Sequence, residues 1–89
     1  MYEIIVQHPA ERFIKSLKKE EQRKILDSIE RLVDKPHLGK ELVGRLTGLR
    51  SLRVGIYRII YKTEDTKLII LVLRIGFRRN IYAKNVKNP

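Results

Sequence analysis

Arginine and aromatic residues alternate through the second half of this 89-residue chain, and they are the side chains best suited to chemistry. The arginines are Arg50, Arg53, Arg58, Arg74, Arg78 and Arg79, and the aromatic residues near them are Tyr57, Tyr61, Phe77 and Tyr82. A guanidinium group is planar, always charged and able to hold a phosphate through two hydrogen bonds, whereas an aromatic ring can stack on an unpaired base. The pattern therefore indicates a site for single-stranded RNA. For Tyr57 and Tyr61 we favour a position in the core of a sheet, and Phe77 could instead pack against a helix.

The positive charge of the chain is concentrated in the same half. Of the net charge of +10, residues 1–48 contribute little, with ten Lys and Arg against eight Asp and Glu, whereas residues 49–89 hold ten against two. A positive field this localised attracts a polyanion. We therefore expect nucleic acid or another polyanion at the second half, and an ordinary solvated surface on the first.

Cleavage of RNA by this chain would have to proceed without a metal ion or a cofactor. The sequence has no cysteine, and His8 and His37 lie too far apart for a typical zinc-binding pair. The RNA's own 2′-hydroxyl can serve as nucleophile, and arginines can stabilise the charge that develops on the phosphate. Arginine remains protonated and cannot act as the base. The acid–base role then falls to Tyr82, to the RNA or to the ribosome.

Hydrophobic spacing predicts the elements that position these residues. We expect a strand over 2–6, helices over 9–19 and 20–35, and strands over 49–54, 56–62 and 67–75. In the loop-like stretch 36–48, Leu42 and Leu46 are expected to anchor the chain to the core. Gly55 predicts a bulge or a tight bend, and Gly76 is expected to end the last strand. That strand is apolar on both faces, which predicts a central position in the sheet.

The order β-α-α-β-β-β predicts an α+β fold, in which a small, mostly antiparallel sheet of about four strands carries a helical hairpin on one face. The other face would then be free to act as an exposed basic platform. We expect residues 1–89 to form a single domain. No apolar run reaches the roughly 18 residues of a membrane helix, and the N-terminus has no basic region typical of a signal peptide. With the absence of cysteine, these features favour the cytoplasm.

Two segments resemble a known family, the RelE/ParE toxins. Residues 52–61 (LRVGIYRIIY) are similar to the family's strand hairpin, and residues 75–82 (IGFRRNIY) are similar to its ending. The leading strand and the helical hairpin agree with the family as well, so the resemblance covers nearly the whole chain and implies a RelE-like fold.

The resemblance implies a toxin that enters the ribosomal A site and cuts the mRNA codon, leaving a 2′,3′-cyclic phosphate, with no metal or cofactor. It implies catalytic roles for Arg58 and Arg78 at the phosphate, and for Tyr82 in base stacking or acid–base work. The further residues expected to contact RNA are Arg50, Arg53, Arg74, Phe77, Arg79 and Lys84. The implied partner is a RelB-like antitoxin encoded beside the toxin, and the pair is a candidate binder of operator DNA.

The sequence departs from the RelE pattern at one point. RelE enzymes have two lysines at the positions that match Leu49 and Ser51, and neither residue is basic here. Arg50 lies between them, where alternation directs it to the opposite face of the sheet, so Arg53 or Arg50 would have to compensate. Two alternatives stay open: a ParE-like inhibitor of DNA gyrase on the same fold, or an inactive module that binds the antitoxin as a corepressor.

Overall fold

The computed structural model describes residues 1–79 of the chain. The elements follow the predicted order, with a two-residue strand and a short 3-10 turn added before the last three strands. They are β1 (Glu3–Val6), α1 (His8–Lys15), α2 (Lys19–Asp34), β2 (Lys40–Glu41), the 3-10 turn η1 (Gly44–Leu46), β3 (Arg50–Val54), β4 (Tyr57–Glu64) and β5 (Ile69–Phe77). Within residues 1–79, no helix combines the length and the apolar character needed to cross a membrane.

The strands form one five-stranded sheet in the order β1-β5-β4-β3-β2. β1 runs parallel to β5, and the other neighbouring strands are antiparallel. β5 is paired along both edges, in keeping with its apolar sequence, although β4 is the middle strand. The chain therefore has the α+β fold that the sequence predicts, with β2 as an added edge strand.

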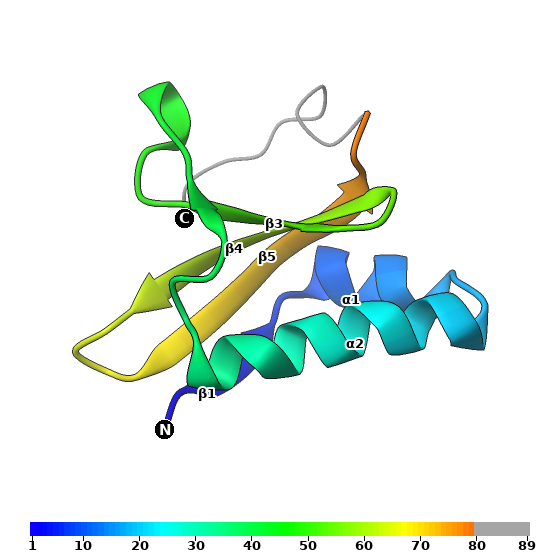
Figure 1. Cartoon of the computed structure of the whole chain (residues 1–89), viewed down its shortest axis with the longest axis horizontal. Helices are drawn as coiled ribbons and strands as arrows, with labels where there is room; N and C mark the ends of the chain where they lie inside the picture. The colour runs from blue at the N-terminus through cyan, green and yellow to red at the C-terminus, as the bar shows by residue number, and fades with distance from the viewer. Residues whose placement is uncertain (80–89) are drawn as a thin grey trace.

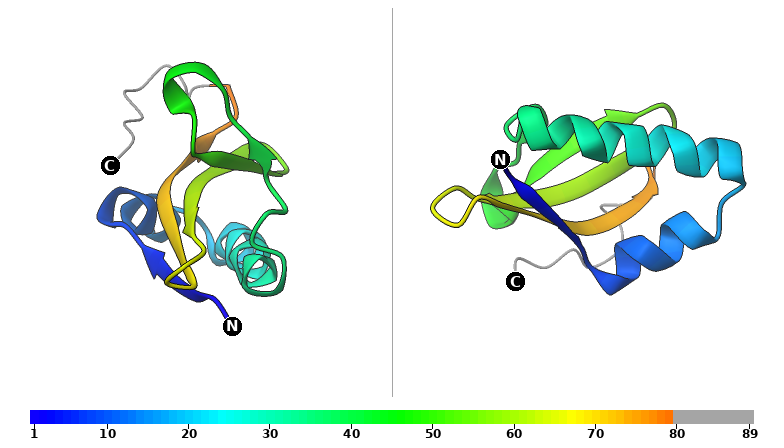
Figure 2. Two further views of the ribbon diagram at one scale, coloured as in Figure 1. Left: turned by 90° about the vertical axis from the view of Figure 1, so that its left-hand side faces the viewer. Right: turned by 90° about the horizontal axis from the view of Figure 1, so that it is seen from below.

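Both helices lie on one face of the sheet, as Figures 1 and 2 show. The spacing that predicts them also determines which side chains are buried: Ala10 and Ile14 from α1, and Ile25, Ile29 and Leu32 from α2. Burying one large aliphatic side chain stabilises a fold by about 1.5–3 kcal/mol, so this apolar layer holds the helical hairpin on the sheet.

A second apolar cluster lies on the opposite face of the sheet. Leu49, Ile60 and Leu73 are buried there. Leu42 and Leu46, from the segment that contains β2 and η1, pack over them, which confirms the anchoring role expected for both leucines. The prediction that this whole face is an exposed basic platform is therefore wrong, because the β2–η1 segment covers part of it.

The pairing of β4 and β5 contains a shift of register that the sequence does not reveal. Ile60 pairs with Arg74, but its neighbour Tyr61 pairs with Val72, so β5 holds one extra residue, Leu73, at this point. An extra residue of this kind reverses the side to which the following side chains point. After Leu73, Arg74 therefore faces away from the helices.

Two sequence-based expectations about glycines have different outcomes. Gly55 has a positive φ of 58° and forms a tight bend between β3 and β4, as expected. Gly76 does not end the last strand, which continues to Phe77. The reason is long-range pairing, since Gly76 lies opposite Arg58 and Phe77 lies opposite Tyr57.

Candidate nucleic-acid interface

Three arginines share the face of the sheet that is turned away from the helices. In the strand register, Arg53 lies opposite Arg58, Arg58 lies opposite Gly76, and Arg74 lies opposite Ile60. Side chains directly opposite each other in a sheet lie on the same face. Because Ile60 belongs to the apolar cluster away from the helices, and Arg58 lies two residues before it on β4, these arginines belong to that face too.

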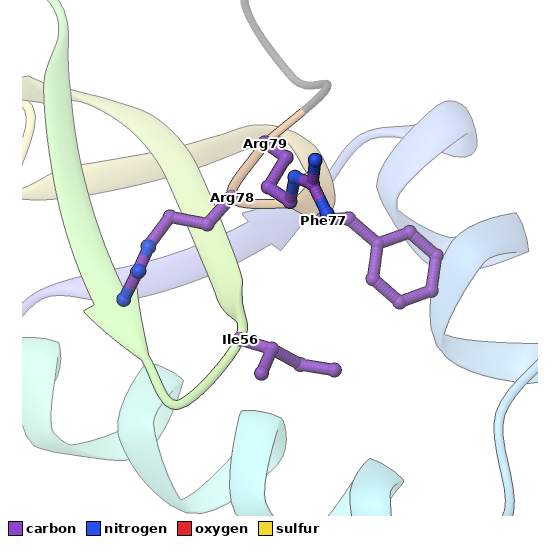
Figure 3. A pocket seen from close by; sticks show the side chains of 4 residues that line it. All are labelled: Ile56, Phe77, Arg78 and Arg79. Carbon is purple, nitrogen blue, oxygen red and sulfur yellow. The ribbon is translucent and has the colours of Figure 1, made fainter.

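Arg78 joins this group at the end of β5. Its backbone N–H donates to the carbonyl oxygen of Ile56 at 2.7 Å, which ties the end of β5 to the β3–β4 turn. In Figure 3 the side chains of Arg78 and Phe77 leave the strand end in opposite directions. Since Phe77 contacts a helix residue, Arg78 lies on the other side. We call Arg53, Arg58, Arg74 and Arg78 the arginine face.

The side chain of Arg58 is held by a hydrogen bond within the sheet. Its Nη1 donates to the hydroxyl oxygen of Ser51 at 3.1 Å. Ser51 is only 3% exposed, and Arg58 itself is half-buried. The guanidinium group of Arg58 therefore has a defined position at the surface of the sheet.

Three arginines of this face have no acidic partner in the part of the chain that the structure describes. Among residues 1–79, no carboxylate forms an ion pair with Arg53, Arg74 or Arg78. The two acidic residues of the second half, Glu64 and Asp65, lie at the far end of β4, about 20 Å along the strand from Arg58. The positive electrostatic field of this face and the grouping of its guanidinium groups together suit a ligand that carries phosphate groups.

Tyr57 and Tyr61 belong to the core, as the sequence analysis favours. The hydroxyl of Tyr61 donates to the carbonyl of Pro36 at 2.9 Å and accepts from the backbone N–H of Gly39 at 2.8 Å. The hydroxyl of Tyr57 donates to the carboxylate of Glu21 at 2.9 Å. Burial raises the pKa of both phenols, and for Tyr57 the bond to Glu21 adds to the rise. Both hydroxyls are therefore occupied by hydrogen bonds within the fold.

Phe77 combines a structural contact with an exposed ring. Its ring lies edge-on to that of Phe13 of α1, with the two ring centroids 5.6 Å apart. The centroid of the Tyr57 ring is also 5.6 Å from that of Phe77. The packing expected against a helix is therefore present, yet Phe77 is 44% exposed. Ile56, Phe77, Arg78 and Arg79 line a shallow pocket of about 360 Å³ beside the β3–β4 turn (Figure 3). This pocket has an apolar wall and two cations, a combination that fits a nucleobase with its phosphate.

The structure does not bring Arg50 to the arginine face. Its Nη1 donates to the carbonyl oxygens of Gly39, at 2.8 Å, and His37, at 3.3 Å. Arg50 therefore fastens the loop after α2, on the side of the sheet to which alternation directs it. Tyr82 and Lys84, which the sequence analysis includes among the site residues, lie outside the described residues.

The two positions that depart from the RelE pattern have structural roles. Leu49 is fully buried in the apolar cluster away from the helices, and Ser51 is hydrogen-bonded to Arg58. In the sequence, Ser51 stands out only because RelE enzymes have a lysine at the matching position. A small polar residue within an apolar strand, as here between Leu49 and Leu52, is too common a pattern to predict a hydrogen bond to Arg58. Within residues 1–79, no three side chains of His, Asp or Glu gather closely enough to hold a metal ion.

Comparison with known proteins identifies the family of the chain. Residues 4–82 match the family model described as the ParE toxin of the type II toxin–antitoxin system parDE. The chain belongs to the RelE/ParE toxin superfamily. Within this superfamily it is 36% identical to toxin RelG of Mycobacterium tuberculosis over 47 residues, which are 53% of this chain and 54% of the relative. It is 37% identical to toxin RelE of the same organism over 59 residues, 65% of this chain and 61% of the relative. The chain thus spans less than two thirds of either curated relative.

Solved structures of the superfamily share the fold over most of the chain. The structure of the RelBE2 toxin–antitoxin complex from Mycobacterium tuberculosis superimposes with a TM-score of 0.79 at 26% identity, covering 86% of this chain and 98% of that one. The archaeal RelE–RelB complex from Pyrococcus horikoshii gives 0.71 at 25% identity, covering 86% and 94%. The isolated RelE toxin of E. coli gives 0.76, covering 93% of both chains, and at 17% identity it supports the fold alone.

Proposed function

We propose that this chain is the toxin of a type II toxin–antitoxin pair and cuts mRNA in the ribosomal A site without a metal ion. The observation that carries the proposal is the arginine face: four guanidinium groups lie on one side of three adjacent strands, away from the acidic residues of the same half. The curated relatives named RelE and RelG favour RNA cleavage over other uses of such a face.

The reaction assigned to this face is attack of a 2′-hydroxyl oxygen on the adjacent phosphorus. The O2′–P bond forms, the P–O5′ bond breaks, and the products are a 2′,3′-cyclic phosphate and a 5′-hydroxyl. The 2′-hydroxyl loses its proton and the leaving 5′-oxygen gains one. Arg58 and Arg78 would bind the phosphate oxygens and stabilise the negative charge that grows on them. Because both remain protonated, the proton transfers fall to Tyr82, to the RNA or to the ribosome.

Further RNA contacts are proposed around this centre. Arg53 and Arg74 would bind flanking phosphates along the sheet. Phe77 and Arg79 would hold a neighbouring nucleotide in the pocket beside Ile56, with the exposed ring of Phe77 against the base. Lys84 is also proposed to contact the RNA, as its charge suggests.

An antitoxin of the RelB kind is the proposed protein partner. Several solved relatives are toxin–antitoxin complexes, and the strong positive charge of this chain favours an acidic partner. We further propose that residues 1–89 act as one domain in the cytoplasm, and that the complex with the antitoxin binds operator DNA.

The deciding experiment is cleavage of mRNA on programmed ribosomes, read by primer extension. Purified wild-type protein should cut within the A-site codon, and Arg58→Ala and Arg78→Ala should each lower the cleavage rate by about 100-fold. Arg23→Ala, an exposed arginine of α2 on the other side of the molecule, is the matched control and should leave the rate unchanged. Circular dichroism should show that all variants are folded. Full cleavage by both Arg58 and Arg78 variants would overturn the proposal.

A second candidate function is inhibition of DNA gyrase. It is favoured by the matching family model, which is that of a ParE toxin, and by the absence of a basic side chain at Leu49 and Ser51. This function predicts trapped gyrase–DNA breaks after expression while mRNA stays intact. Primer extension and plasmid linearisation in the same cells distinguish the two functions.

A further inference from the structure

Ser51 is an unusual residue on the face away from the helices. Among the described residues, the buried polar or charged side chains are Ser28 and Ser51, and Ser51 is the more buried at 3% exposure. It lies within β3, between the buried Leu49 and the exposed Arg53, which share its face. A buried hydroxyl in a strand needs a hydrogen-bond partner, and here that partner is the Nη1 of Arg58 at 3.1 Å.

This hydrogen bond joins Arg58 of β4 to the neighbouring strand β3. The register pairs Arg58 with Arg53, and Ser51 with Ile60. To reach Ser51, the side chain of Arg58 must cross diagonally from its own pair to the next one. The Nη1 of Arg58 therefore lies beside β3, at the level of the Ser51–Ile60 pair.

A serine hydroxyl is well suited to this task. It accepts a hydrogen bond without carrying charge, so the positive charge of Arg58 stays available for a phosphate. A carboxylate at the same position would neutralise it, and a second cation would repel it. The serine side chain is short and buried, so little conformational entropy is lost in holding it.

We propose that Ser51 is a positioning residue for Arg58: its hydroxyl fixes the guanidinium group in the orientation that binds the phosphate on the arginine face. The inference rests on the proposed function in one respect, namely that Arg58 takes part in RNA cleavage. The orientation of Arg58 can be measured whether or not the chain cuts RNA.

The first test is NMR of the arginine side chains in the folded protein. The Nη signals of Arg58, identified by their loss in Arg58→Ala, should shift in Ser51→Ala, and their exchange with solvent should quicken. Ser28→Ala removes the other buried serine hydroxyl, from α2, and should leave them unchanged. If Ser51→Ala fails to fold, Ser51→Thr and Ser51→Val can be compared instead, because the two variants differ mainly in one hydroxyl. The Arg58 signals should shift in Ser51→Val and stay closer to those of the wild type in Ser51→Thr. Unchanged Arg58 signals in the variants that lack the hydroxyl would overturn the proposal.

The second test asks whether Ser51 acts through Arg58. Single-turnover cleavage by Ser51→Ala should fall by about tenfold, since hydrogen bonds to charged groups contribute at this level. In the Arg58→Ala background the same substitution should cause no further loss. A tenfold loss in both backgrounds would mean that Ser51 acts on its own or through packing, and would refute the positioning role. If the wild-type chain cuts no mRNA, the proposed function fails, while the NMR test still decides the role of Ser51.

Discussion

Arg53 and Arg58 lie directly opposite each other on β3 and β4. Like charges in this arrangement repel each other and weaken a pair of strands. Neither arginine belongs to the two apolar clusters that hold the sheet together. A cost of this kind is offset when an anion binds between the two groups. The pair therefore supports the proposed phosphate-binding surface.

The first prediction concerns the dependence of RNA binding on salt. Removing one phosphate contact by Arg58→Ala should weaken binding of a single-stranded RNA and lower the slope of log affinity against log salt by about 0.7–1. Fluorescence anisotropy with an oligonucleotide whose 2′-hydroxyls are blocked measures binding without cleavage. Arg23→Ala changes the net charge equally but lies on α2. An equal change of slope in that control would argue against a local site.

The second prediction separates the two roles of Phe77. Phe77→Leu keeps an apolar side chain against Phe13 but removes the exposed ring. Because stacking on one base contributes about 1–3 kcal/mol, RNA affinity should fall by about tenfold, with a melting temperature close to that of the wild type. Phe77→Tyr retains the ring and should bind normally. RNA binding that is unaffected in Phe77→Leu would assign the residue to packing alone.

The third prediction concerns the hydroxyl of Tyr61. Tyr61→Phe removes the acceptor of the Gly39 N–H and the donor to the Pro36 carbonyl. A buried backbone group left without a partner costs about 1–3 kcal/mol, so the free energy of unfolding should fall by that amount. Urea denaturation measures it. The hydroxyl of Tyr57 bonds to Glu21 near the surface, so Tyr57→Phe should lower the free energy of unfolding less than Tyr61→Phe. If Tyr57→Phe were the more destabilising of the two, the proposed anchoring of the loop after α2 would be contradicted.

The fourth prediction concerns the space at Gly39. A Cβ atom there would lie 2.7 Å from Cε1 of Tyr61 and 3.0 Å from the carbonyl oxygen of Ser51. Gly39→Ala should therefore force the ring or the strand to shift, at a cost of about 1–3 kcal/mol. Lys40→Ala, at the exposed next residue, should have little effect. A Gly39→Ala protein as stable as the wild type would show that this contact yields easily.

The fifth prediction is a pH dependence centred on Asp65. The phenol of Tyr2, at 2.7 Å, and then the ring of His37, at 3.2 Å, lower the pKa of this carboxyl in the folded protein. A carboxyl whose folded pKa lies below its unfolded value of about 3.9 stabilises the fold above that pH, and loses this effect as the pH falls through the folded pKa.

The wild type should therefore be more stable than Asp65→Asn at neutral pH, and the difference should shrink in acid below about pH 4. Thermal melts over a range of pH measure this difference. Asp27→Asn, at an exposed position on α2, provides the comparison. A difference that grows as the pH falls would have the wrong sign for the proposed interaction.

Much of the fold could be predicted because its information is local. The spacing of Ala10 and Ile14, and of Ile25, Ile29 and Leu32, defines two helix faces without reference to the rest of the chain. Gly55 predicts its turn locally as well, because glycine readily adopts the positive φ found there. The two-residue β2 has no such pattern, and it forms only because Lys40 and Glu41 come to lie opposite β3. Long-range pairing of this kind leaves no local signal.

The sequence by itself determined which residues are candidates for the chemistry: arginines interleaved with aromatic rings, in a half with almost no acidic residues. Only the tertiary structure decided on which face they lie. With strict alternation along β5, Arg74 would share the side of Ile70 and Val72, against the helices. The extra residue at Leu73 turns Arg74, Gly76 and the following Arg78 to the other side. The physical reason is that side-chain direction alternates with a period of two, while the register depends on β4, a separate strand.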